Sequence, residues 1–118
     1  MTGKITVYER PTCSKCREMA KLLKDAGVDF EKINYYIEPL SATKIAELLK
    51  KMDLPARSLL RTSEAIYKEL GLAKADLSEN ELIALMAKHP DLMQRPIVVR
   101  GDKAVLGRPT ENVQALLK

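Results

Sequence analysis

The sequence predicts one α/β domain over residues 1–118: a strand–helix–strand unit, then a block of helices, then a strand–strand–helix unit. Three observations lead to this prediction. The alternating, β-branched run Ile5–Tyr8 is typical of a strand. Apolar residues then recur at helical spacing from Met19 to Ala26. Near the C-terminus, two apolar runs flank the turn residues Gly101 and Asp102. A chain of 118 residues is long enough for one hydrophobic core.

The N-terminal part predicts two parallel strands joined by a helix. The helix starts near Cys16, and Gly27 is placed to cap its C-terminal end. A second strand is expected within Val28–Tyr35. A strand–helix–strand connection of this length makes a right-handed crossover, so the two strands are expected to be parallel.

The middle of the chain predicts helices. One helix is expected to begin at Pro39 or Ser41, and its apolar face consists of Ile45, Leu48, Leu49 and Met52. A short helical turn is expected at Ala56–Leu60.

Two further helices are expected before the last strands. Thr62 or Ser63 is predicted to cap the first of them, and Gly71 to close it. Ser78 and Glu81 have the spacing of a capping box ahead of the second, because a serine at the N-cap and a glutamate three residues later can satisfy two backbone N–H groups.

The C-terminal part predicts a hairpin and a last helix. The strands are Pro96–Arg100 and Lys103–Leu106, and Thr110 is predicted to cap the helix. The complete order of elements is the layout of a thioredoxin-like domain, βαβ followed by ββα with a mixed four-stranded sheet. The helical block, about residues 41–90, is then an insertion between the two halves.

Composition excludes several classes of function. The net charge is +4, but the basic residues are scattered without a long cluster, so nucleic-acid binding is not expected. No stretch approaches the roughly 20 apolar residues of a membrane span. The first residues contain no apolar signal-peptide core, and we expect a cytoplasmic protein.

Cys13 is the candidate reactive residue. It lies in a loop between a predicted strand and a predicted helix, where the helix N-terminus favours a thiolate, and Arg10, Lys15 and Arg17 are nearby in sequence. Cys16 follows one helical turn later and could resolve an intermediate on Cys13 by forming a disulfide, although it also fits the apolar face of the helix. We expect no metal site, since zinc needs about four ligands and His89 is the only other soft candidate.

Three arginines at predicted element boundaries are candidates for binding an oxyanion: Arg61, Arg95 and Arg108. A planar guanidinium can hold a tetrahedral oxyanion through two hydrogen bonds at once. Taken singly, each such arginine is more often a solvated cation or a cation paired with a helix dipole.

The motifs together resemble one family. They are Ile5–Tyr8 leading to Pro11-Thr12-Cys13, Ala56–Arg61, His89-Pro90, Arg95–Val99 and Gly107-Arg108-Pro109. Over nearly its whole length the chain resembles the glutaredoxin-coupled arsenate reductases and their relatives, which include the Spx-type transcription regulators.

The resemblance implies a function. Cys13 matches the nucleophile that attacks arsenate to give a cysteinyl-arsenate intermediate, and Arg61, Arg95 and Arg108 match the arginines that bind the oxyanion. It also implies a cis bond from Arg95 to the following proline. The reductant of the intermediate would be glutathione with glutaredoxin, or Cys16 followed by glutaredoxin or thioredoxin. No bound cofactor is implied, and a monomer is expected.

Two residues depart from the family pattern. Glu9 stands where these enzymes usually have a histidine, and Cys16 stands where they lack a cysteine. A Cys-X-X-Cys pair is what Spx-type regulators use as a redox switch. The alternatives are therefore a redox-sensing regulator that binds RNA polymerase and a general thiol–disulfide oxidoreductase. Arg108 in Gly-Arg-Pro favours the reductase.

Overall fold

A computed structural model describes residues 4–10, 14–107 and 110–117. The chain forms two compact units. The first, which we call the sheet unit, consists of Met1–Glu38 together with Arg95–Lys118. The second, which we call the helical unit, consists of Pro39–Gln94.

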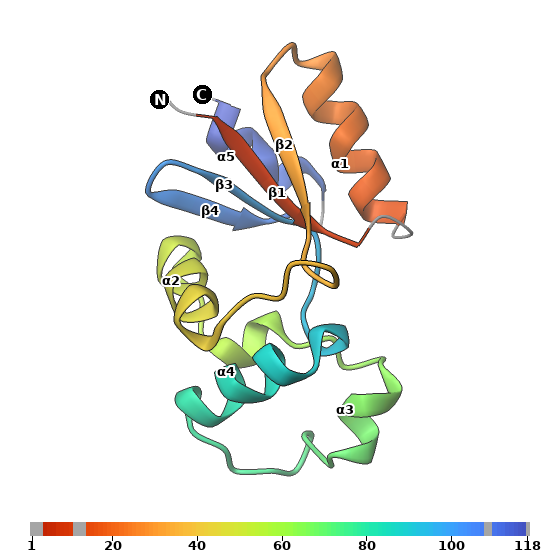
Figure 1. The fold of residues 1–118 in the computed structure, drawn as a ribbon, viewed down its shortest axis with the longest axis vertical. Helices are drawn as coiled ribbons and strands as arrows, with labels where there is room; N and C mark the ends of the chain where they lie inside the picture. Colours follow the sequence, from red (N-terminus) through yellow and green to blue (C-terminus); the bar gives the residue numbers. More distant parts are fainter. Residues whose placement is uncertain (1–3, 11–13, 108–109, 118) are drawn as a thin grey trace. The chain divides into compact units, whose positions relative to one another are not determined.

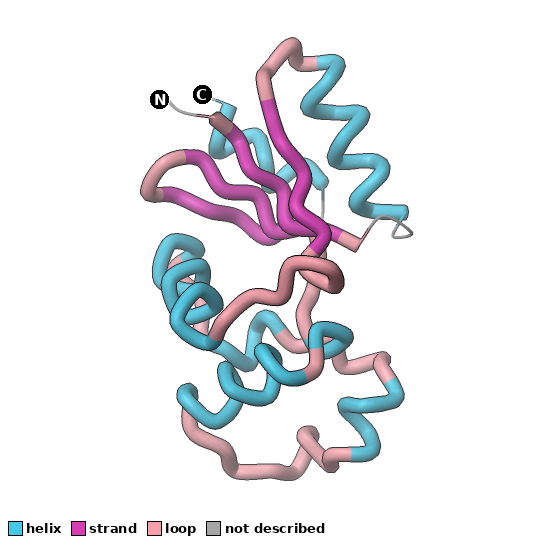
Figure 2. The backbone as a smooth tube through the Cα atoms, in the orientation of Figure 1, coloured by secondary structure: helices cyan, strands magenta, loops and turns pink. Residues whose placement is uncertain are grey.

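Four strands form the sheet of the first unit, in the order β2-β1-β3-β4 (Figure 1). Their bounds are Ile5–Glu9 for β1, Phe30–Asn34 for β2, Ile97–Arg100 for β3 and Lys103–Leu106 for β4. β1 runs parallel to β2 and antiparallel to β3, and β3 and β4 are antiparallel, so the sheet is mixed. Figure 2 shows the four strands lying next to one another.

The strand ends follow from the register. Tyr8 lies opposite Ile33 of β2 and Ile97 of β3, and Glu9 is opposite Asn34 at the carboxyl ends of the two parallel strands. Gly101 has a φ of 63°, the left-handed conformation that a tight hairpin turn requires and that glycine adopts without steric cost. The register of β1 and β2 places Glu9 and Asn34 at the same end of the sheet, where both strands finish.

Helices α1 (Ser14–Asp25) and α5 (Gln114–Leu117) share one hydrophobic core with the sheet. A 3-10 helix, η3 (Thr110–Val113), leads into α5. The buried core residues are Ile5, Val7, Met19, Leu23, Val98, Val113 and Leu116. Because residues of both α1 and α5 belong to this cluster, the two helices cover the same face of the sheet.

The helical unit contains three α-helices and two 3-10 helices: α2 (Ala42–Met52), η1 (Ala56–Leu59), α3 (Ala65–Glu69), α4 (Glu79–Lys88) and η2 (Pro90–Leu92). α2 packs against α4, and both 3-10 helices contact α4. Ser41 caps α2, and Ser78 with Glu81 forms a complete capping box on α4. A carboxylate in the first turn of α4, that of Glu79, accepts the backbone N–H of Ala56 at 2.9 Å and ties η1 to α4.

The predicted thioredoxin-like α/β fold is confirmed, including both halves of the sheet and the helical block between them. Two predicted caps are wrong. α3 begins after Glu64 rather than after Thr62 or Ser63, and no side chain caps it. Thr110 is the first residue of η3 instead of a cap on α5, because the chain enters α5 through a 3-10 turn.

The helices between β2 and β3, from α2 to η2, lie within the unit Pro39–Gln94. That residues 1–118 form one domain stays a prediction. None of the helices described is long and apolar enough to cross a membrane.

Candidate functional site

Cys13 and Arg108 lie outside the described residues, so their predicted roles stay predictions. The residues on either side of 11–13 are described. Arg10 follows β1, and its guanidinium carbon lies 4.9 Å from the centre of the Tyr36 ring, a cation–π contact. Ser14 begins α1. In the sequence, residues 11–13 therefore stand between the carboxyl end of β1 and the start of α1.

Cys16 is completely buried in α1. It lies on the same side of the helix as Met19 and Leu23, which belong to the sheet-unit core. A buried thiol is closed to reductants in solution, so any reaction of Cys16 would have to start from a neighbouring sulfur. Both interpretations of Cys16, a resolving cysteine and a core residue, are compatible with this position.

Arg61 is held by two side chains of the helical unit. Its Nε donates to Oε1 of Glu64 at 3.0 Å, and its Nη1 donates to Oε1 of Gln94 at 3.3 Å. The Arg61 side chain is 16% exposed, so this guanidinium is largely removed from water. Its backbone is fixed as well, since the N–H of Arg61 donates to the carbonyl of Leu92 at 2.7 Å.

The segments around Arg61 and Gln94 are paired. Leu60 and Met93 form an antiparallel bridge, and the N–H of Gln94 donates to the carbonyl of Leu59 at 2.8 Å. Gln94 is followed directly by Arg95 in the chain. Two segments of the helical unit that are more than thirty residues apart in the sequence are thus held together.

Arg95 is the most buried of the described candidate arginines, with 6% of its surface exposed. A buried guanidinium is costly unless negative or acceptor groups surround it. The Arg95–Pro96 bond is cis, as the resemblance implied. β3 starts one residue later, at Ile97.

Gly107 allows a close approach just before Arg108. The N–H of Gly107 donates to the carbonyl of Pro96 at 2.8 Å. A Cβ at this position would lie 2.5 Å from Cε of Met19 and 2.9 Å from Cγ of Pro96. Only glycine fits there without a shift, so the chain after β4 passes tightly against both α1 and the residue that follows Arg95.

Glu9 is a buried charged residue that the sequence did not show to be buried. Its surface is 5% exposed, although it ends a strand next to a loop. Burial raises the pKa of its carboxyl group, and the ion pair with Lys32 partly opposes that rise. Nζ of Lys32 lies 3.8 Å from Oε1 of Glu9, which is an ion-pair distance but longer than a strong hydrogen bond.

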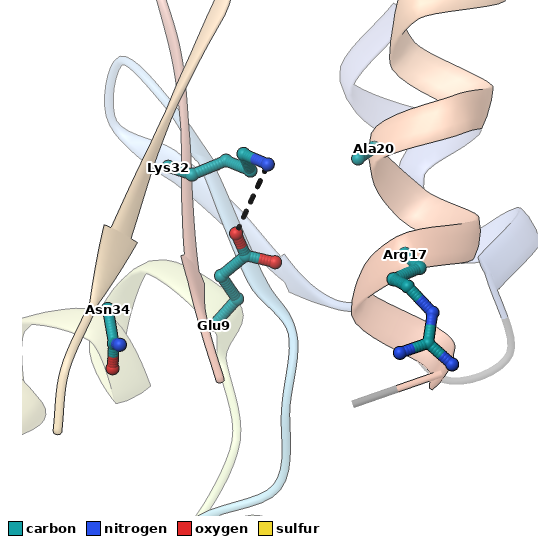
Figure 3. Close-up of a pocket in the computed structure, with 5 residues that line it drawn as sticks. All are labelled: Glu9, Arg17, Ala20, Lys32 and Asn34. Carbon is teal, nitrogen blue, oxygen red and sulfur yellow. Dashed lines mark ion pairs between the residues drawn. The ribbon is translucent and has the colours of Figure 1, made fainter. Parts of the chain in front are cut away.

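A cavity of about 350 Å³ adjoins Glu9 in the sheet unit. Its lining residues come from β1, β2 and α1: Glu9, Arg17, Ala20, Lys32 and Asn34. Figure 3 shows the Glu9 carboxylate and the Lys32 ammonium directed toward each other. The sequence contained one signal for this cavity, because the last residues of two parallel strands lie at the same edge of a sheet.

The chain is similar to known proteins over almost its whole length. The model of the ArsC family matches residues 8–116. The uncharacterized protein YfgD of Escherichia coli (strain K12) is 46% identical over 114 residues, which are 96% of each chain. A protein named arsenate reductase, from Neisseria meningitidis serogroup A, is 37% identical over 96% of this chain and 97% of its own length.

The fold is also that of solved relatives. The structure of an arsenate reductase from Vibrio cholerae superposes with a TM-score of 0.91, at 37% sequence identity, over 98% of both chains. The similarity therefore spans both compact units and not the sheet unit alone.

Proposed function

The chain belongs to the ArsC family, and on that premise we propose that it is an enzyme that reduces arsenate to arsenite with electrons from thiols. The observation that carries the proposal is the similarity to proteins named arsenate reductase over almost the full length of both chains. The burial of Arg95 supports an oxyanion as the substrate, because a charged hydrogen bond is stronger away from water.

The proposed reaction begins at Cys13. Its thiolate attacks the arsenic atom, an S–As bond forms, and one oxygen leaves as water after protonation. A second thiol then attacks the Cys13 sulfur, the S–As bond breaks, and its electron pair goes to arsenic, which leaves as arsenite. Arsenic gains two electrons, and two thiols become one disulfide. The arginines act by holding the oxyanion against the thiolate and by neutralising its charge.

Arg95 and Arg61 are proposed to have unequal roles. Arg95 is the more buried, and a charged hydrogen bond in such a place contributes more than one at the surface. Arg61 already donates from Nε and Nη1 to Glu64 and Gln94. We therefore assign most of the substrate binding to Arg95, together with Arg108.

Replacing Arg95 with lysine tests this assignment. Lysine keeps the charge but loses the planar two-point contact, so the KM for arsenate is expected to rise about 10- to 100-fold. The measurement is steady-state arsenite formation over a range of arsenate concentrations. Arg100→Lys is the matched control, because Arg100 is an arginine of the same strand region that donates to the carbonyl of Leu116. Equal KM values for both variants would contradict the role of Arg95.

The reductant is proposed to be glutathione with glutaredoxin, or thioredoxin if Cys16 resolves the intermediate. The test is an arsenite-formation assay run separately with each reducing system. Replacing Cys16 with alanine should abolish turnover with thioredoxin if Cys16 resolves, and should leave turnover with glutathione and glutaredoxin in place. No arsenite with either system would contradict the proposed function.

A second candidate function is general thiol–disulfide exchange. The spacing of Cys13 and Cys16, one helical turn apart, favours it. Turnover of arsenate is compared with turnover of a mixed disulfide of glutathione at equal enzyme concentration. Faster turnover of the mixed disulfide, with no arsenite formed, would establish this candidate in place of the first.

A further inference from the structure

The cavity beside Glu9 contains an unusual combination of charges. Glu9 supplies a carboxylate from the end of β1, Lys32 supplies an ammonium from β2, and Arg17 supplies a guanidinium from α1. Asn34 adds an amide group. In Figure 3 the Arg17 side chain extends toward the start of α1, away from the Glu9–Lys32 pair. The cavity therefore has one acidic position and two separate basic positions.

The acidic group is buried and the basic groups are accessible. The Glu9 side chain is 6% exposed, whereas the Lys32 side chain is 54% exposed. Among the described residues, Lys32 is the one cation paired with Glu9, at 3.8 Å. Within the part of the chain that the structure describes, this carboxylate is therefore only partly compensated, because water cannot solvate it and a single ammonium 3.8 Å away replaces only part of that solvation. A ligand that brings a second positive group to Glu9 would remove this cost.

The charges restrict the class of ligand. A simple anion would be attracted by Lys32 and Arg17 but repelled by Glu9, and a simple cation would meet the opposite arrangement. A zwitterion satisfies both sets of groups. The head group of an α-amino acid carries an ammonium and a carboxylate on one carbon, and a cavity of about 350 Å³ is within the range of small-molecule sites.

We propose that this cavity binds the α-amino acid head group of a small thiol, with the ammonium on Glu9 and the carboxylate on Lys32 or Arg17. The thiol part of the inference rests on the proposed function, in which a thiol supplies the electrons. Glu9 ends the strand that leads into the Cys13 loop, and Arg17 lies on the helix that follows this loop. The cavity is thus built on the two elements that flank the nucleophile in sequence.

The carboxyl group of Glu9 responds to a nearby positive charge. Burial raises the pKa of this carboxyl group, and the Lys32 ammonium lowers it. A ligand ammonium would act in the same direction as Lys32 and would favour the ionised carboxylate.

Binding is tested directly, without turnover. The same head group occurs in a free amino acid and in a γ-glutamyl thiol, so the probes are glutamate and S-methylglutathione, which cannot react at sulfur. Affinity is measured by calorimetry, and the site is located by NMR shifts of the backbone amides of Glu9, Ala20 and Asn34. Binding of S-methylglutathione alone identifies the thiol peptide as the ligand, whereas equal binding of both probes means that the head group suffices and the thiol part is wrong.

Variants of the cavity decide which groups bind. Glu9→Gln keeps the shape and removes the charge, and it is expected to weaken S-methylglutathione at least about tenfold, the effect of losing one charged hydrogen bond. The control is Lys21→Gln, since Lys21 lies on α1 but is 79% exposed and pairs with Asp25. An S-methylglutathione analogue without the γ-glutamyl amino group should bind the protein and Glu9→Gln equally well.

Two different results would contradict the cavity assignment and the proposed function. Unchanged affinity in Glu9→Gln, or shifts confined to other residues, would overturn the cavity assignment even if arsenite is formed. Binding at the cavity without arsenite formation by any thiol would instead contradict the proposed function and leave the head-group site in place.

Discussion

The Glu64 carboxylate limits how the Arg61 guanidinium can bind an anion. Its Nε is bound to the Glu64 carboxylate, and its side chain and that of Glu64 are 16% and 27% exposed. An oxyanion that binds Arg61 must compete with this carboxylate or share the guanidinium with it. We therefore expect Glu64 to weaken substrate binding, while Gln94, a neutral acceptor, helps to hold the arginine in place.

Replacing Glu64 with glutamine should lower the KM for arsenate about two- to fivefold. The amide still accepts a hydrogen bond from Arg61, but the competing negative charge is gone, and a partly exposed ion pair contributes up to about 1 kcal/mol. Steady-state kinetics of arsenite formation measures the change. Glu69→Gln is the control, since it removes the same charge from α3 without a contact to Arg61 among the described residues. A higher KM in Glu64→Gln would show that the carboxylate positions Arg61 instead of competing for it.

Glu9 is expected to make the free energy of unfolding fall as pH rises. Its pKa in the folded protein lies above the usual 4.5 because burial disfavours the charged form. Between the two pKa values the folded state binds more protons than the unfolded state, so Glu9 lowers the free energy of unfolding as pH rises through its folded pKa. The Lys32 ammonium lowers the pKa of Glu9 and so limits this loss.

Glu9→Gln removes this titration. The free energy of unfolding of the variant, relative to the original chain, is expected to increase from pH 4 to pH 8. Urea denaturation at several pH values measures it, and the difference between the two proteins isolates Glu9 from all other groups. A difference that stays constant over this range, or that falls, would mean that burial does not raise the pKa of Glu9.

At the scale of elements, the end of α2 carries the one described non-glycine residue with a positive φ. Asp53 has φ 56° and ψ 47°, the left-handed conformation. The N–H groups of Asp53 and Leu54 donate to the carbonyls of Lys50 and Leu49, both at 3.1 Å, which is the hydrogen-bond pattern of a Schellman motif. Glycine is the usual residue at this position because a Cβ is disfavoured there.

Asp53→Gly should raise the free energy of unfolding by about 1 kcal/mol, because it removes the steric cost of the left-handed conformation. Chemical denaturation measures the change. Asp76→Gly is the control: Asp76 is also an exposed aspartate of the helical unit, but its φ is not positive, so glycine there should be neutral or slightly destabilising. Equal effects of the two substitutions would show that backbone strain at Asp53 is not the cause.

For the whole molecule, local patterns predicted the elements but not the charged contacts. The apolar periodicity of α1 and α2, the capping box at Ser78 and the hairpin turn at Gly101 depend on residues close together in the sequence, and each was found. The pairing of Arg61 with Gln94 and the burial of Glu9 depend on segments that only the tertiary fold brings together. The cap of α3 was mispredicted because several polar residues precede the helix and spacing alone does not choose among them.

The candidate site was predictable as a set of residue types and not as an arrangement. Motifs around Arg61 and Arg95 indicated an oxyanion site, and the structure adds that Arg95 is buried and that Arg61 is bound to Glu64. The Glu9 cavity was not predicted, since a glutamate at a strand end is usually exposed to solvent.

The central claim is that Cys13 is the nucleophile of an arsenate reductase, and arsenite formation by Cys13→Ser tests it most directly. The original chain and the variant are compared at equal concentration with glutathione and glutaredoxin, after circular dichroism has shown that both are folded. Loss of a nucleophile removes the covalent route, so the variant is predicted to form arsenite at least about a thousandfold more slowly. Arsenite formation by Cys13→Ser within a few-fold of the original rate would contradict the claim.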